Sequence, residues 1–202
     1  MRRFAIWAGL GALALVPVLL AAWSPYLAFR QPVYIVAGFA GIAALALMLF
    51  QPLLASLLLP GMSAARGRRL HVWVGTAVVG LVIIHVGGLW ITSPPDVIDA
   101  LLLRSPTPFS AWGVLAMVAL FGAGMLALAR GWIGVRAWRV GHTLLVATAV
   151  IATVPHAWLI EGAMEPFSKA VLLAAALFTL ALAVRRRQVW RVVWRRRRLE
   201  RG

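Results

Sequence analysis

Six long runs of apolar residues constrain this 202-residue chain more than any other feature. A helix of about 20 apolar residues crosses the ~30 Å hydrocarbon core of a bilayer and satisfies its own backbone hydrogen bonds. The runs lack the alternation of apolar and polar residues that barrel strands need. The sequence therefore predicts an all-α membrane protein with six transmembrane helices. They lie at Phe4–Trp23, Val33–Leu59, Leu70–Ile91, Ala111–Ala129, Val140–Ile160 and Lys169–Val184.

The basic residues predict the orientation of this bundle. With the N-terminus inside, seventeen of the twenty Lys and Arg side chains fall on the inner side, and cytoplasmic loops are the ones enriched in these residues. Both termini are therefore predicted to be cytoplasmic. Residues 1–184 form the helical domain, and residues 185–202 form a basic tail that lies on anionic lipid. Because topology explains the net charge of +15, we expect no nucleic-acid binding.

Two compositional features narrow the setting further. The chain has no cysteine, which removes disulfides, thiolate-held iron–sulfur clusters and zinc-thiolate sites together. Nineteen of its twenty basic residues are arginine, which favours a GC-rich bacterial genome and hence a multi-pass protein of the bacterial inner membrane. The first run also resembles a secretory signal, but its apolar core is long enough to remain as the first span.

All four histidines of the chain lie in the third and fifth runs. His71 and His85 are fourteen positions apart, as are His142 and His156. Fourteen residues come to about four helical turns, so each pair lies on one face with ~21 Å between its members. The two helices run in the same direction in the predicted topology. If their faces meet, the side chains form an inner pair, His71 with His142, and an outer pair, His85 with His156.

Imidazoles inside a membrane need partners and are usually functional. Two ligands at each level, with no cysteine or buried carboxylate, would leave a zinc ion undercoordinated. The number of ligands alone does not exclude copper. Haem needs only two axial ligands, so it fits both levels and favours electron transfer across the bilayer. Small residues on the two helices would leave room for a flat ring, or they serve the close packing that is usual between membrane helices. They are Gly75, Gly80, Gly87, Gly88, Gly141, Ala147 and Ala149. Structural hydrogen bonding to the backbone is one alternative. The other is a proton relay, in which the protein is a redox-silent transporter or assembly subunit.

Two segments, "RRLHVWVGTAVVGLVIIHVGG" and "WRVGHTLLVATAVIATVPHAW", resemble the third and fifth helices of the ferric reductase-like transmembrane domain family. This resemblance covers roughly residues 33–184 and implies two haem b groups, with His71, His142, His85 and His156 as ligands of the haem iron. It implies a ferric reductase-like oxidoreductase component. The chain is also similar to the haem-binding membrane subunit of bacterial periplasmic methionine sulfoxide reductases, which lacks a histidine corresponding to His71.

Full-length members of the family continue into a cytoplasmic flavin and nicotinamide module, whereas no Gly-rich nucleotide loop occurs in this sequence. We therefore expect a separate cytoplasmic donor, such as a flavoprotein that carries the flavin, and an acceptor on the periplasmic side. Four arginines near the inner pair are candidates to contact haem propionates or the donor, namely Arg68, Arg69, Arg136 and Arg139. Ordinary positive-inside arginines are the alternative interpretation.

Overall fold

The computed structural model describes residues 1–187 and contains no strand in that range. Six of its helical segments are long and apolar enough to cross a membrane, so the predicted fold class is confirmed. The helices are α1 (Arg2–Ala22), η1 (Pro25–Leu27), α2 (Pro32–Met48), α3 (Phe50–Ser56), α4 (Ala64–Thr92), α5 (Pro94–Leu101), α6 (Pro108–Leu128), η2 (Ala129–Gly131), α7 (Val135–Leu159) and α8 (Pro166–Arg187). Helices α2 and α3 together make the second span.

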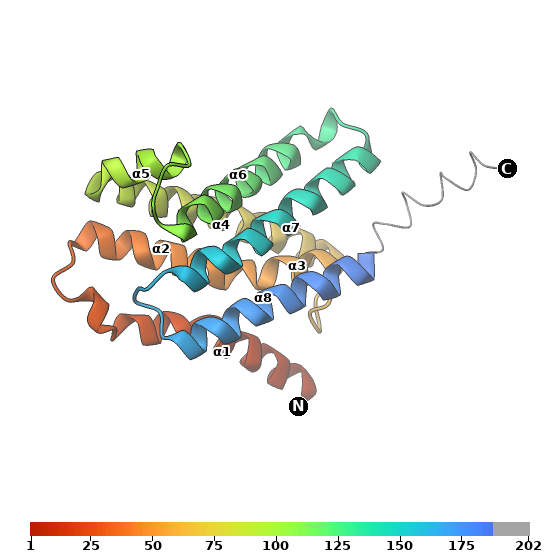
Figure 1. Ribbon diagram of the computed structural model, residues 1–202. Helices are drawn as coiled ribbons and strands as arrows, with labels where there is room; N and C mark the ends of the chain where they lie inside the picture. Colours follow the sequence, from red (N-terminus) through yellow and green to blue (C-terminus); the bar gives the residue numbers. More distant parts are fainter. Residues whose placement is uncertain (188–202) are drawn as a thin grey trace.

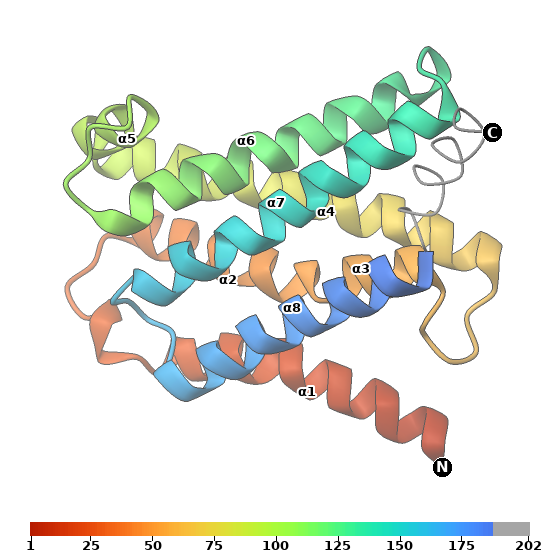
Figure 2. The same ribbon diagram turned by 45° about the vertical axis from the view of Figure 1, so that its right-hand side comes forward.

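The spans pack as two antiparallel hairpins with a further helix pair beside them. Helix α4 runs along α2, and α7 runs along α6, as the two views of Figures 1 and 2 agree. Helices α1 and α8 pack against each other and against the α2–α3 span. The short helix α5 lies at one end of the bundle, in the connection between α4 and α6 (Figure 1).

Proline sets the start of several helices. Pro32, Pro94 and Pro108 occupy the first positions of α2, α5 and α6, and α8 begins at Pro166. The first residue of a helix has no intrahelical acceptor for its N–H, so proline costs nothing there and its fixed φ suits the helix. At the start of α8, the Glu165 carboxylate accepts hydrogen bonds from the backbone N–H groups of Phe167 and Ser168, at 2.7 and 2.6 Å.

The second span is divided at Leu49, as expected for a helix that contains Pro52. Proline removes one backbone donor and its ring crowds the carbonyl four residues earlier, which here belongs to Met48, the last residue of α2. Helix α7 runs unbroken through Pro155. The connection between the third and fourth spans contains the short helix α5, whose Val97 is buried.

The predicted spans started three or more residues too late at four helices. Helix α4 begins at Ala64 rather than Leu70, α6 at Pro108 rather than Ala111, α7 at Val135 rather than Val140, and α8 at Pro166 rather than Lys169. At α4 and α7 the hydropathy runs stop at arginines, whereas the helices continue through them. Lys169 lies inside the bundle with 7% of its surface exposed, and its Nζ donates to the carbonyls of Trp158 and Ile160 at 3.3 and 2.9 Å.

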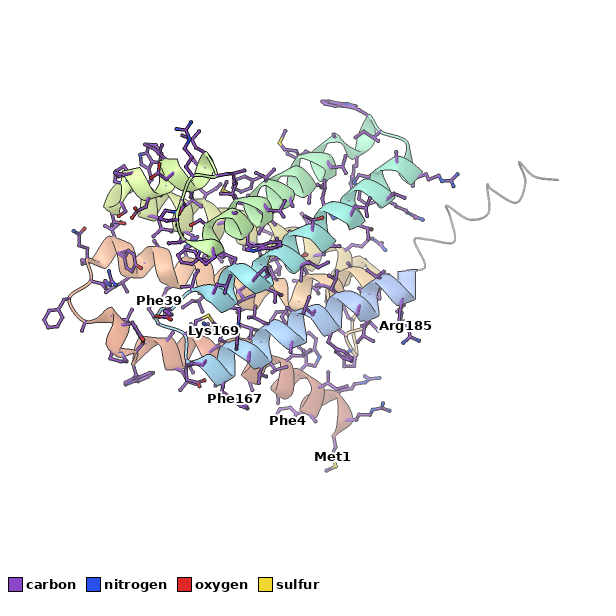
Figure 3. All side chains as sticks on the ribbon, in the orientation of Figure 1. Met1, Phe4, Phe39, Phe167, Lys169 and Arg185 are labelled. Carbon is purple, nitrogen blue, oxygen red and sulfur yellow. The ribbon has the colours of Figure 1, made fainter. Side chains whose placement is uncertain are left out.

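Basic residues gather at one end of the bundle, which we call the basic end. Figure 3 shows Met1 and Arg185 at this end and Lys169 at the other. The first turns of α4 and α7 also lie at the basic end, because each of these helices follows a span that arrives there (Figure 2). The cytoplasmic orientation of this end stays a prediction. Helix α8 continues to Arg187, and the rest of the predicted basic tail lies outside the described residues.

Candidate functional site

The structure brings the four histidines together as two pairs between α4 and α7. At the basic end, the ring centroids of His71 and His142 are 6.4 Å apart, and their planes meet at 74°. The second pair, which we call the distal pair, is His85 and His156, with centroids 6.5 Å apart and planes at 79°. All four side chains are half-buried. The matched spacing in sequence therefore becomes two matched levels in space.

Each histidine is oriented by a backbone carbonyl of the neighbouring helix in its own hairpin. The Nδ1 atoms of the α4 histidines donate to the α2–α3 span, and those of the α7 histidines donate to α6. The bonds are His71 to Gln51 O at 3.3 Å, His85 to Ala37 O at 2.7 Å, His142 to Ala123 O at 3.2 Å and His156 to Phe109 O at 3.0 Å. A carbonyl only accepts, so Nδ1 carries the proton and the lone pair of each neutral ring lies on Nε2.

Two glycines make room for the distal pair. A Cβ placed on Gly41 of α2 would lie 2.9 Å from Nδ1 of His85, and one on Gly113 of α6 would lie 2.6 Å from Nδ1 and Cε1 of His156. Real Cβ atoms essentially never come closer than 3.0 Å to such neighbours. Each glycine lies four residues after the carbonyl that accepts from the ring, and thus directly beside that carbonyl on the helix surface. Both glycines are therefore part of the site.

Three of the glycines predicted to leave room for a flat ring serve a different purpose. A Cβ on Gly88 would lie 2.7 Å from the Cβ of Ala37, and one on Gly75 would lie 3.3 Å from the Gln51 amide. A Cβ on Gly141 would lie 2.9 Å from a methyl of Leu126. The prediction was wrong for these positions, because the glycines allow close packing within each hairpin. At Gly80 and Gly87, by contrast, a Cβ would meet no atom within 4 Å.

A layer of buried apolar side chains lies between the two histidine levels. Val78 lies midway between the histidines of α4, and Ala149 lies midway between those of α7. Their exposed fractions are 1% and 2%, and they share one core cluster with Val150, Ala119 and other apolar residues. The predicted small residue Ala149 therefore packs in this layer.

The basic-end pair has two polar neighbours that the sequence interpretation missed. The side-chain amide of Gln51 donates to the backbone carbonyl of His71 at 3.2 Å. The backbone carbonyl of Gln51 accepts the hydrogen bond from His71 Nδ1 described above. The indole of Trp138 stacks on the His142 ring, with centroids 5.6 Å apart and planes at 19°. Within the described part of the chain, Trp138 Nε1 is buried without a hydrogen-bond partner. The place of Trp138 one turn before His142 is the sequence signal that could have linked it to the site.

The four arginines singled out in the sequence lie in the first turns of α4 and α7. Arg68 and Arg69 precede His71, and Arg136 and Arg139 precede His142. All four are exposed and belong to the basic end. Both histidine-bearing helices thus contribute arginines to the basic end, which makes the potential there positive.

The spacing of each histidine pair is that of two imidazoles that share one metal ion. A histidine nitrogen binds a transition metal at about 2.0–2.1 Å, and the centre of the ring lies ~1.2 Å behind that nitrogen, which gives about 6.4 Å between two centroids. Among residues 1–187, no group of three or more His, Asp or Glu side chains could hold an ion alone. An ion at either level would thus need most of its ligands from a bound molecule.

Comparison with known proteins was made at the level of families, of curated sequences and of solved structures. The family model described as "Ferric reductase like transmembrane component" matches residues 40–153, which is more than half of the chain. This range holds three of the four histidines and ends three residues before His156. No curated protein and no solved structure matches the chain.

Proposed function

Because the chain belongs to the ferric reductase-like transmembrane family, we propose that this membrane oxidoreductase component carries electrons across the bilayer through two haem b groups. The ligands are His71 with His142 at the basic end, and His85 with His156 at the distal level. The observation that carries the proposal is the pair of centroid distances, 6.4 and 6.5 Å, between helices whose histidines have the same tautomer.

The donor set supports haem rather than a bare metal ion. Each level offers two neutral imidazoles, and a haem iron has four porphyrin nitrogens and takes two axial ligands from the protein. When bound, haem supplies a one-electron iron couple. The hydrogen bonds that Nδ1 donates to backbone carbonyls fix each ring and raise the basicity of Nε2. Gly41 and Gly113 keep the distal rings free of side-chain collisions.

The apolar layer between the levels argues for electrons rather than protons. A proton relay needs a chain of polar groups, and an ionisable or hydroxyl side chain inside a membrane marks such a path. Between the two histidine levels, Val78, Ala149 and Val150 are buried among other apolar residues. Two hydroxyls also lie between the levels, but each donates to a carbonyl of its own helix, Thr76 to Val72 O at 3.0 Å and Thr153 to Ala149 O at 2.7 Å. An electron, in contrast, needs no continuous hydrogen-bonded path.

The charge distribution suggests where the partners act. The exposed arginines Arg68, Arg69, Arg136 and Arg139 form a positive surface at the basic end, which suits an acidic electron donor such as a flavoprotein. We propose that this end is cytoplasmic in a bacterial inner membrane, because positive loops stay inside. A membrane potential that is negative inside then assists outward electron movement by about 2.3 kcal/mol per 100 mV. The acceptor lies on the periplasmic side.

Optical spectroscopy of the purified protein tests this function. We expect reduced-minus-oxidised bands of b type and two haems per chain. His85→Ala should lose one haem and keep the other, and His71→Ala should give the converse, so the two single-haem spectra should add to that of the wild type. A wild-type protein without b-type bands after expression with sufficient haem would refute the proposal.

A further inference from the structure

We propose that the indole N–H of Trp138 donates a hydrogen bond to a carboxylate at the edge of the tetrapyrrole held by His71 and His142. Trp138 is then a positioning residue of the basic-end site. This inference rests on the proposed function and deepens it, because it identifies a group of the chain that recognises the periphery of the cofactor and not its iron.

The position of Trp138 ties it to the basic-end pair. It lies four residues before His142, which is one turn of α7 and the same face of the helix. The two rings are stacked, with centroids 5.6 Å apart and planes at 19°. Its ring therefore lies beside an axial ligand candidate, on the side that faces the polar end of the bundle.

The hydrogen-bonding state of Trp138 indicates that this place receives an acceptor. An indole N–H only donates, and buried polar groups nearly always have partners. Nε1 of Trp138 is buried and has none in residues 1–187. Side-chain carboxylates do not provide one, because the four acids within residues 1–187 are Asp96, Asp99, Glu161 and Glu165, all in or beside connections at the opposite end of the bundle.

A haem carboxylate suits this N–H in charge as well as in place. Haem b carries two carboxylates on one edge, and their charge favours a position toward the polar end of a membrane site. Arg136 and Arg139 lie in the same turns of α7 as Trp138, so the region around the indole is positive. The N-terminal end of α7 adds the positive end of its helix dipole.

A lipid phosphate is the other possible acceptor, and the contrast with Trp132 argues against it. Trp132 lies at the same end of the bundle, is 93% exposed and behaves as an interfacial aromatic. Trp138 is half-buried, contacts a histidine ring and hides its nitrogen from the surface. The geometry therefore favours an acceptor inside the histidine site.

Loss of the N–H should change the redox behaviour of the basic-end haem in a defined direction. A carboxylate near the iron stabilises the ferric form, and a donated hydrogen bond weakens this influence. Trp138→Phe keeps an aromatic ring against His142 and removes the donor together with part of the indole. We expect the midpoint potential of the basic-end haem to fall. The pKa of the carboxylate should rise, so the pH dependence of that potential should move to higher pH.

The test is a potentiometric titration of the haem-loaded full chain, with Trp132→Phe as the matched control. The inference predicts that Trp138→Phe lowers one of the two potentials and leaves the other unchanged, while Trp132→Phe leaves both unchanged. In a His85→Ala background, the remaining potential should show the same fall. Unchanged potentials in a Trp138→Phe protein that retains both haems would overturn the inference and leave the proposed function intact. A wild type that binds no haem overturns both.

If Trp138→Phe loses the basic-end haem, ultraviolet resonance Raman spectroscopy of the indole N–H tests the same hydrogen bond. The difference between the spectra of wild type and Trp138→Phe isolates the Trp138 signal. A change of this signal between haem-loaded and haem-free protein supports the inference. A signal that responds to removal of lipid and not to haem identifies a lipid phosphate as the acceptor and overturns it.

Discussion

Replacement of Gly113 by alanine tests the distal site at its tightest contact. A Cβ at this position would lie 2.6 Å from Nδ1 and Cε1 of His156, whereas ordinary contacts begin at 3.4 Å. The imidazole must therefore move by about 0.8 Å, unless α6 and α7 separate. Metal–nitrogen distances hold to within about 0.2 Å, so a displacement of this size is incompatible with an unchanged bond to the iron.

The substitution should weaken haem binding at the distal level and should not destabilise α6. Overpacking of a well-packed position costs about 1–3 kcal/mol, which corresponds to roughly 5- to 150-fold weaker retention of the distal haem. Alanine is a better helix former than glycine by about 1 kcal/mol, so α6 itself should be stabilised by the substitution. Gly113→Ala thus separates an effect on the ligand from an effect on folding.

The assay is the haem-to-protein ratio of purified protein, together with a redox titration. Gly113→Ala should lose the distal haem partly or wholly and keep the basic-end haem. Gly122→Ala on the same helix is the control, because its Cβ would lie at an ordinary 3.5 Å from Leu145. A Gly113→Ala protein with two haems at wild-type potentials would refute the steric reasoning, and so would equal losses in both variants.

Three further predictions follow from the described contacts. The planes of both histidine pairs lie near the perpendicular, at 74° and 79°, so electron paramagnetic resonance of the oxidised protein should give highly anisotropic low-spin signals; normal rhombic signals would contradict this geometry. Lys169→Met removes the donor to two carbonyls at the end of α7, so it should lower the melting temperature and shift the distal potential more than the basic-end one. The backbone N–H groups of Ser168 and Phe167 hold the pKa of Glu165 below its usual value. This stabilisation is present above the ordinary glutamate pKa and is lost as the pH falls through the lowered value, so the difference in melting temperature between wild type and Glu165→Gln should vanish at acidic pH.

The sequence predicted the pairing of the histidines because that pairing depends only on helix periodicity and topology. Fourteen residues bring His85 back over His71, and an even number of helix reversals makes α4 and α7 parallel. Neither inference needs to know how neighbouring helices are rotated or shifted against each other.

The supporting groups were not predictable in this way, because they depend on the register between two helices. Nothing in the sequence around Gly113 tells that it faces His156, and nothing around Gly75 tells that it faces Gln51. Glycines on the ligand-bearing helices were the natural candidates for room near a cofactor. The glycines next to the imidazole rings, Gly41 and Gly113, are instead on α2 and α6, whose carbonyls accept hydrogen bonds from those rings. Trp138 was concealed by its resemblance to the other aromatics at helix ends.

The two hairpins repeat one arrangement, and this repetition explains why both levels exist together. The α7 histidines follow the α4 histidines by 71 positions, and the carbonyls that accept from them follow by 72. Gly113 likewise follows Gly41 by 72 positions. Within each hairpin, the two acceptor carbonyls are fourteen residues apart, as the histidines are, so one antiparallel register satisfies both levels at once. A slip of one residue in either hairpin would rotate both of its histidines by about 100° and break both pairs, whereas a Cβ at Gly113 acts on one level alone.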